Sequence, residues 1–226
     1  MDRRLFVALA LAAVTAAAGG SVAMARTSPS IRLPEPRLEG RVSVERALKA
    51  RRSVRAFQTA PLTLGEISQL LWAAQGVTGS AGHRTAPSAG ALYPLTLYLA
   101  VGKVSGLQPG VYRYDPADHS LVRTGEGDRR ALVGAAAGQD WLEQAAAIVV
   151  ISANPTRTTA RYGARGQRYV HIEAGHAAEN LSLQAAALGL GVTDVGTFDD
   201  AKVKRVMGLA AAEAPVLLLP IGRPRS

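Results

Sequence analysis

The spacing of apolar residues predicts two well-defined helices. Thr63 and Glu66 form a capping box, and apolar positions at helical spacing follow it until Gly76. A second, long helix is expected over about 168–188, ended by Gly189. Three shorter helices are expected, each at a capping residue: 44–50 after Ser43, an Ala-rich helix after Asp128 and a helix from Asp199-Asp200.

The middle of the chain alternates in the way typical of strands. Leu95 to Val101 places leucines at every second position, and a hairpin is expected where residues 111–114 and 120–123 flank Asp115-Pro116-Ala117-Asp118. Two continuous apolar runs, 147–152 and 216–219, predict buried strands, the second with Pro220 at its end. Because strands and helices do not alternate regularly, an α+β fold with a mixed sheet flanked by helices is favoured.

The N-terminus differs in composition from the rest. Basic residues Arg3-Arg4 precede an Ala/Leu/Val run and a small-x-small site ending at Ala25, so residues 1–25 are interpreted as a cleaved signal peptide. A non-cleaved membrane anchor is disfavoured by the weak hydrophobicity of this run. The chain is thus expected to be exported, periplasmic or secreted, and both general export and the twin-arginine route stay open. Residues 26–42 predict an extended arm or linker, and residues 43–226 one folded domain.

Composition limits the chemistry. The 226 residues include no Cys, which excludes disulfides, Cys-ligated zinc and thiol redox chemistry, so redox activity requires a bound cofactor. The 48% hydrophobic content is sufficient for a core. The formal charge of +9 is scattered and lacks interleaved aromatic residues, so no nucleic-acid partner is expected.

Two segments carry candidate chemistry. Arg51, Arg52 and Arg55 surround Ser53, and guanidinium groups with a hydroxyl suit a phosphate, although a solvated basic turn is the plainer interpretation. The loop over 82–94 offers hydroxyls and backbone amides stiffened by prolines, and its plainer interpretation is a connection.

No metal site is expected on the long helix. His171 and His176 lie five residues apart, which separates them by about 140° around the axis, so they cannot share one ion. Glu173 and Glu179 each lie three residues from His176, and ordinary pairing along a helix explains that spacing.

Four motifs stand in a fixed order along the chain. They are Arg51-Arg52-Ser53-Val54-Arg55-Ala56-Phe57, Pro87-Ser88-Ala89-Gly90-Ala91-Leu92-Tyr93-Pro94, Arg161-Tyr162 leading into Glu173-Ala174-Gly175-His176, and Ala187-Leu188-Gly189-Leu190-Gly191. Together they resemble the nitroreductase superfamily over about residues 43–223, and the second and third resemble its SagB-type branch.

The resemblance implies a homodimer with FMN at the subunit interface. It implies that the Arg51–Arg55 cluster holds the FMN phosphate and the pyrimidine edge, that the partner subunit contributes the 87–90 loop, and that a backbone amide near flavin N5 is that of Gly196. Tyr162, Arg161 and His83 are the candidates for polarising a substrate, although a structural or surface role is the plainer interpretation of each. The implied cofactor-binding residues are Arg51, Arg52, Ser53, Arg55, Pro87, Ser88, Ala89, Gly90, Val195, Gly196, Thr197, Gly222 and Arg223. For Arg223, a frayed basic tail is an equal alternative.

The function implied is an exported FMN-dependent oxidoreductase that acts on a small organic substrate by a ping-pong mechanism. Two alternatives stay open. One is a SagB-type dehydrogenase that oxidises peptide azolines, which Arg161 disfavours because the azoline-oxidising members carry Lys there and arginine cannot act as a base. The other is a flavin-binding relative without turnover. The electron donor is not identified by the sequence, since nicotinamide cofactors are not expected outside the cytoplasm.

Overall fold

The computed structural model describes residues 30–225, so the predicted signal peptide lies outside the described residues. The helices are α1 (Val44–Ala50), α2 (Leu64–Gln75), η1 (Ala89–Ala91), α3 (Arg130–Ala137), η2 (Asp140–Gln144), α4 (Thr156–Tyr162), α5 (Arg165–Ala187) and α6 (Asp200–Met207). The strands are β1 (Ser30–Arg32), β2 (Leu62–Thr63), β3 (Leu95–Val101), β4 (Val104–Ser105), β5 (Gly110–Asp115), β6 (Ser120–Glu126), β7 (Ala147–Ala153), β8 (Gly191–Val192) and β9 (Ala214–Gly222).

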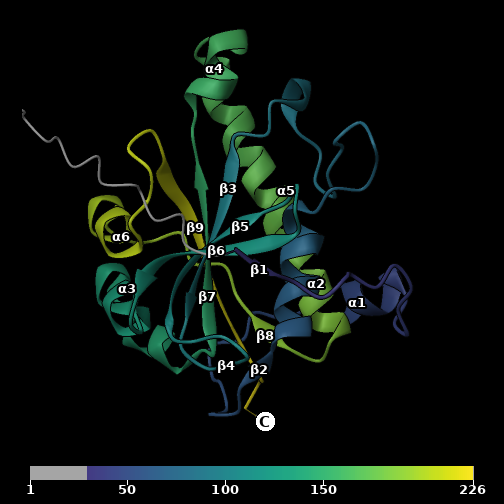
Figure 1. The fold of residues 1–226 in the computed structure, drawn as a ribbon, viewed down its shortest axis with the longest axis vertical. Helices are drawn as coiled ribbons and strands as arrows, with labels where there is room; N and C mark the ends of the chain where they lie inside the picture. The colour runs from purple at the N-terminus through teal and green to yellow at the C-terminus, as the bar shows by residue number, and fades with distance from the viewer. Residues whose placement is uncertain (1–29, 226) are drawn as a thin grey trace, which may run out of the picture.

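A seven-stranded sheet in the order β1-β6-β5-β3-β7-β9-β8 forms the centre, and its strand pairs are antiparallel (Figure 1). Strands β2 and β4 form a separate parallel pair. Helices lie on both sides of the large sheet, as the predicted α+β fold requires.

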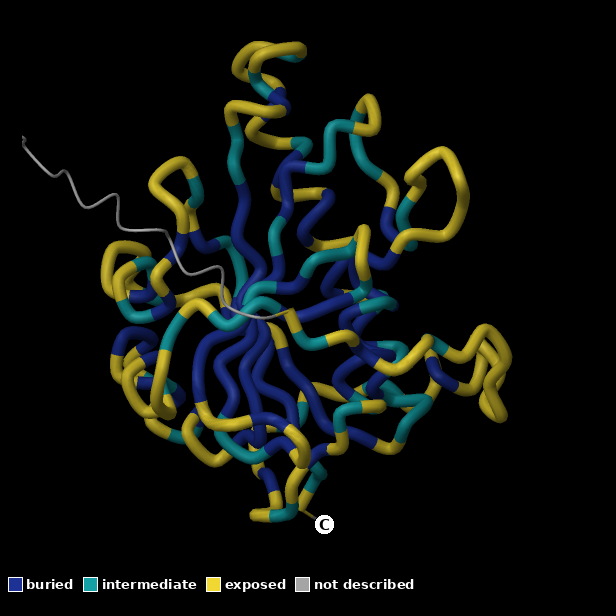
Figure 2. Tube along the Cα trace, in the orientation of Figure 1, coloured by how far each residue is buried: buried dark blue, intermediate teal, exposed yellow. Residues whose placement is uncertain are grey.

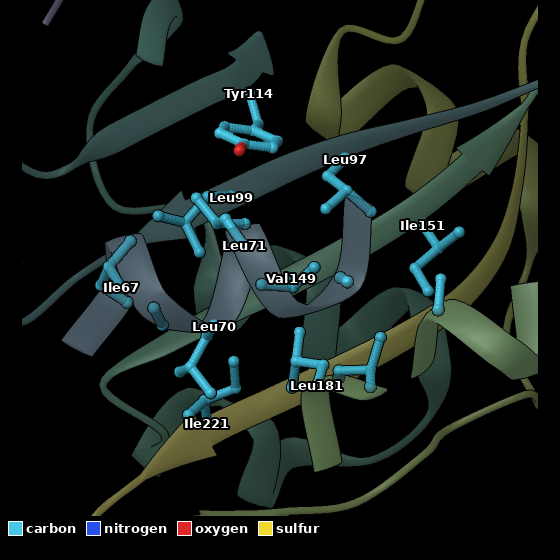
Figure 3. Close-up of a cluster of buried hydrophobic side chains, with 14 of the residues drawn as sticks. Ile67, Leu70, Leu71, Leu97, Leu99, Tyr114, Val149, Ile151, Leu181 and Ile221 are labelled. Atoms are coloured by element: carbon cyan, nitrogen blue, oxygen red, sulfur yellow. The ribbon is translucent and has the colours of Figure 1, made fainter. Parts of the chain in front are cut away.

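Two hydrophobic layers explain why the central strands are apolar at every position. Leu97 and Leu99 of β3 face α2 and α5, whereas Tyr98 and Ala100 face the other side, where α3 and α6 pack. Figure 3 shows the first layer, with Leu70 and Leu71 of α2 and Leu181 of α5 against the strands. In Figure 2 the strands are accordingly buried, and the exposed residues lie on outer helix faces and loops. Burial on both faces accounts for the continuous apolar run in β7.

Most predicted elements are confirmed. The Thr63 capping box is present, since the Thr63 hydroxyl accepts from the Glu66 amide at 3.2 Å and a Glu66 carboxylate oxygen accepts from the Thr63 amide at 2.8 Å. The predicted helix 44–50, both strands of the hairpin and the helix after Asp199 also form where expected.

Three details differ from the predictions. The N-cap of α3 is Arg129, and Asp128 instead accepts a hydrogen bond from the Arg130 amide (3.0 Å). The long helix begins at Arg165, three residues early, after a short helix α4 that the pattern did not predict. Pro220 lies inside β9, where it is paired with Ile148 of β7. On the other edge of β9, β8 pairs only with Ile221 and Gly222, and the bridge from Val195 reaches Leu218, so no ladder partner is lost through the missing N–H of Pro220.

The segment predicted as an arm lies against its own domain over the residues described. Residues 30–32 pair with β6, and Leu33 is buried. The Gln69 side chain makes two hydrogen bonds to the backbone of Arg37: it accepts from the amide (2.8 Å) and donates to the carbonyl (3.1 Å). Among residues 30–225, no helix is long and apolar enough to cross a membrane, and no three His, Asp or Glu side chains gather as a metal site would require.

A buried polar network holds the arm to α2. His119 lies between the hydroxyls of Ser68 (2.7 Å to Nε2) and Tyr114 (2.8 Å to Nδ1), and Nε2 also lies 3.0 Å from the carbonyl oxygen of Pro34. Ser68 donates its hydrogen to the same carbonyl (2.5 Å). The network therefore connects three segments that are distant in sequence.

Replacing His119 by Ala should lower the free energy of unfolding by about 2 kcal/mol, because the buried Tyr114 hydroxyl is left without its partner. Urea unfolding measures this change, and amide exchange in β1 should become faster. Asp118→Ala, an exposed change in the same turn, is the control. Equal stability of the two variants would mean that the network does not hold the arm.

Candidate functional site

The basic segment 51–55 and the C-terminal Gly222-Arg223, which were predicted to bind the same cofactor from opposite ends of the domain, lie at one edge of the structure. After α1 the chain runs extended between β8 and the C-terminal tail. Ser53 forms a parallel bridge with Val192, and Phe57 forms an antiparallel bridge with Pro224. The predicted cofactor-binding residues of the first motif therefore lie beside Gly222 and Arg223.

Two glycines make this close approach possible. A Cβ atom at Gly191 would lie 2.6 Å from Cγ1 and 2.9 Å from Cβ of Val54, and a Cβ atom at Gly222 would lie 2.9 Å from Cδ1 of Phe57. Any side chain at either position would push the extended segment away from the sheet. Gly222, predicted as a cofactor contact, thus has a packing role of its own.

The three arginines of the first motif differ in their partners. The Nε atom of Arg51 lies 3.6 Å from Oε1 of Glu179 on α5, so its charge is partly balanced. Arg52 donates to the backbone carbonyls of Lys49 (3.0 Å) and Arg51 (2.7 Å), and within residues 30–225 neither Arg52 nor Arg55 pairs with a carboxylate. Two exposed positive charges therefore remain available to an anion here.

Arg223 is ordered by an ion pair and does not fray. Its Nη2 atom donates to both carboxylate oxygens of Glu66, at 3.0 and 3.1 Å, while Glu66 also serves the capping box of α2. A contact from Arg223 to a phosphate would have to use its other nitrogens, which make no hydrogen bond within the described residues.

The residues after β8 divide into a buried anchor and an open turn. Val195 exchanges two backbone hydrogen bonds with Leu218 of β9 (2.9 and 3.0 Å), and its side chain is buried in the core. Gly196 and Thr197 are exposed, and a Cβ atom at Gly196 would meet only Leu217, 3.9 Å away. The structure thus leaves space for a ligand beside Gly196, the residue predicted to face the reacting atom, while Val195 holds the turn in place.

A second group of predicted residues gathers near the start of α5. Pro87 is exposed, and the loop that follows it brings Gly90, with φ of 62°, against α4. A Cβ atom at Gly90 would lie 2.7 Å from the Tyr162 hydroxyl oxygen and 2.9 Å from Nη1 of Arg161. The loop is held from within, since Ser88 accepts a hydrogen bond from the Tyr93 amide (2.8 Å). Ser88, Ala89, Gly90 and Tyr162 therefore form one cluster.

One subunit does not bring the two groups together. In Figure 1, α4 lies at the top of the molecule and β8 near the bottom. Ser88 and Ala89 face Glu173, whereas Arg51 pairs with Glu179, six residues along α5, which is about 9 Å further along the axis and about 120° around it. The two groups thus approach α5 from different sides.

The pockets of a single subunit agree with this separation. The cleft beside Arg51, Arg52 and Val192 has a volume of about 200 Å³, below the range usual for cofactor sites. A larger pocket of about 550 Å³ lies between the arm, α2 and α5, next to Trp72, and none of the predicted cofactor-binding residues lines it. The predicted cofactor-binding residues therefore do not line a single pocket within the described chain.

The structure also adds residues that had no assigned role. Arg84 lies 4.5 Å above the ring of Tyr93 and donates to Gln75 (2.7 Å), and burial lowers its pKa. Glu173 is buried beside the same loop. A signal for Glu173 was present in the sequence, since it occupies a helical position on the apolar face of Val170 and Ala177. No comparable signal for Arg84 was present in the sequence, because residues in a loop do not follow a regular spacing from which their contacts could be predicted.

Comparison with known proteins identifies the relatives of this chain. The pattern of the Nitroreductase family matches residues 48–223. The chain is 46% identical over 183 residues to a "putative nitroreductase" of Methanocaldococcus jannaschii, covering 80% of this chain and 91% of that protein. The crystal structure of a "putative nitroreductase" from Ralstonia eutropha is 35% identical, with a TM-score of 0.78, and the match covers 89% of this chain and 92% of that one.

A more distant structure has the same fold. The NADPH:FMN oxidoreductase of Vibrio harveyi, complexed with NAD+, is 19% identical with a TM-score of 0.59, and the match covers 81% of this chain and 69% of that one. The motifs quoted from the sequence fall inside the matched region, in residues that the fold gathers into two clusters. The chain belongs to the nitroreductase family.

Proposed function

We propose that this chain is an exported, FMN-dependent oxidoreductase that acts on a small organic substrate. The observation that carries the proposal is the meeting of the 51–55 segment with β8 and the C-terminal tail, next to an open turn at Gly196. Exposed guanidinium groups, a serine hydroxyl and unencumbered backbone amides are the donor set that a flavin phosphate and an electron-rich ring require.

Each residue of the site has a proposed role that follows from its functional group. Arg52, Arg55 and Ser53 would hold the phosphate and the pyrimidine edge of FMN, with Arg51 oriented by Glu179. Bound FMN supplies hydride acceptance and donation at N5. The Gly196 amide would be the donor beside the reacting edge of that group, and the two Val195–Leu218 hydrogen bonds hold the backbone next to this amide in place.

We propose that a second copy of the chain completes the site. The 200 Å³ cleft is too small for FMN, and no residue of the 87–90 loop of the same chain lines it. Exposed apolar side chains offer an interface, since Leu38, Val44 and Leu48 are 80%, 66% and 54% exposed and lie together on the arm and α1. In such a dimer, Tyr162 beside Gly90 would face the flavin held by the other subunit and polarise a substrate.

We propose a ping-pong order, in which the electron donor and the substrate would bind in turn beside the same flavin. Oxidation of peptide azolines, the SagB-type alternative, is disfavoured because the residue beside Tyr162 is Arg161, which stays protonated and cannot accept a proton. A relative that binds flavin without turnover would show reduction of the flavin but no transfer to any substrate.

Export is a separate part of the proposal, carried by residues 1–25. Replacing Arg3-Arg4 by Lys-Lys should stop export by the twin-arginine route and leave general export intact. Fractionation of cells that produce each form measures the difference.

The test of the cofactor is direct binding. The purified full chain should have a flavin visible spectrum and release FMN on denaturation, one per chain. Arg55→Ala should weaken FMN binding roughly tenfold or more, the size of one charged hydrogen bond, and leave riboflavin binding unchanged if Arg55 holds the phosphate. Arg205→Ala, exposed on α6, is the control. A colourless chain that also fails to bind added FMN would overturn the proposal.

A further inference from the structure

Glu173 is an unusual carboxylate in this fold. It lies in α5 with 2% of its surface exposed, and neither carboxylate oxygen has a hydrogen-bond partner within the described residues. Burial raises its pKa above the ordinary value of 4.5. Because an unpartnered buried charge destabilises a fold, its presence requires an explanation outside the stability of the core.

The groups around Glu173 come from the loop that carries Ser88, Ala89 and Gly90. The Ser88 hydroxyl and the Ala89 amide lie close enough to oppose the rise of its pKa, although neither reaches hydrogen-bond geometry with an oxygen. The charges of Arg84 and Arg157 act in the same direction. The Ser88 oxygen already accepts from the Tyr93 amide, which leaves its hydrogen free to point at Glu173.

This loop has a backbone that needs outside support. Ala91 and Tyr93 have φ of 53° and 46°, in the left-handed region that side chains rarely adopt, and Gly90 at 62° separates them from Ser88. Such conformations persist where surrounding contacts determine them, and they gather at ligand sites. Arg84 over the Tyr93 ring supports one side of the loop, and Glu173 lies beneath the other.

We propose that Glu173 is a positioning residue whose buried carboxylate attracts the Ser88 hydroxyl and the Ala89 amide, and thereby fixes the shape in which residues 88–90 are presented to the second subunit. This inference rests on the proposed flavin-binding function. Arg84 and Arg157 balance the charge from the loop side and from α4. Glu173 does not touch the cofactor, so its effect on binding passes through the loop.

The test compares Glu173→Gln with the full wild-type chain. The amide keeps the volume of the side chain but loses the charge and offers a second donor where an acceptor is needed. Hydrogen exchange of the peptide covering residues 88–93 should become about tenfold faster in the absence of flavin, because the Ala91, Leu92 and Tyr93 amides all donate to Ser88 or Ala89. FMN binding should weaken about tenfold.

The thermal stability of the same variant separates positioning from a structural role. Because burial raises the pKa of Glu173, its contribution to stability is present below pH 4.5 and is lost as the pH rises through the folded value. Glu173→Gln should therefore melt at a higher temperature than wild type at pH 8, and the two should converge near pH 4. A residue that merely stabilised the fold would give the opposite sign at pH 8.

Glu143→Gln, an exposed carboxylate on η2, is the matched control and should change none of these measurements. Unchanged exchange over residues 88–93 in Glu173→Gln, or a lower melting temperature at pH 8, would overturn the inference. If the wild-type chain binds no FMN, the proposed function fails, while the exchange result still decides whether Glu173 holds the loop.

Discussion

A single methyl group added at Gly191 should lower the free energy of unfolding by about 2–3 kcal/mol and abolish tight FMN binding. The new Cβ would lie 2.6 Å and 2.9 Å from two Val54 atoms, one of them the branched Cβ, which rotation about χ1 cannot move away. The clash therefore separates β8 from the extended segment and breaks the hydrogen bond from the Val54 amide to Val192 (3.0 Å). Urea unfolding and FMN titration measure the two effects.

Gly65→Ala is the control for this change. A Cβ atom at Gly65 has no heavy atom within 4 Å, and the residue lies in the first turn of α2, so alanine should be neutral or slightly stabilising. The smaller change Val54→Ala in the Gly191→Ala background should recover part of the loss, because it removes the clashing methyl groups. No recovery would mean that the loss arises elsewhere than at this contact.

Asp128→Asn should be the second strongly destabilising change, at about 2–3 kcal/mol near neutral pH. Arg130 is 7% exposed. Its guanidinium donates two hydrogen bonds to the Asp128 carboxylate, from Nε to Oδ1 (2.9 Å) and from Nη2 to Oδ2 (2.5 Å). The same guanidinium also donates to the Ala145 carbonyl. Without the carboxylate, a buried positive charge loses its counter-ion. The expected loss of stability is small for a broken ion pair of a buried arginine, because the Asp128 side chain is 39% exposed and water partly screens the pair.

The pH dependence of this effect has a defined sign. Burial tends to raise the pKa of Asp128, but hydrogen bonds from Arg130 and its charge outweigh burial, so the pKa lies below its ordinary 3.8. The contribution of the pair is therefore present above pH 3.8 and is lost as the pH falls through the folded value. Wild type and Asp128→Asn should differ most near pH 7 and converge in acid. Asp140→Asn, which forms no ion pair within the described chain, is the control.

Elements with local signals were predictable from the sequence. The capping box at Thr63 specifies where α2 begins, and the apolar run from Ala147 specifies β7, because both depend on residues close together in the chain. Helix α4 and the early start of α5 were missed, since residues 156–162 are polar and their helix depends on packing against α5.

The candidate site was also predictable only in part. Its residue types were visible as motifs, and their resemblance to the nitroreductase family was correct. The partners of those residues were not visible, such as Glu66 for Arg223 or Glu179 for Arg51, because each pair joins segments whose distance depends on the whole sheet.

The sequence by itself determined the α+β class, the apolar strands, the helix caps and the family of this protein, because periodicity, capping and short motifs act over a few residues. The tertiary structure alone decided that residues 51–55 meet the C-terminal tail, that Gly90 lies against Tyr162, and that Glu173 is buried beneath the Ser88 loop. These contacts arise from long-range packing, in which many weak interactions together select one arrangement, and no local pattern encodes them.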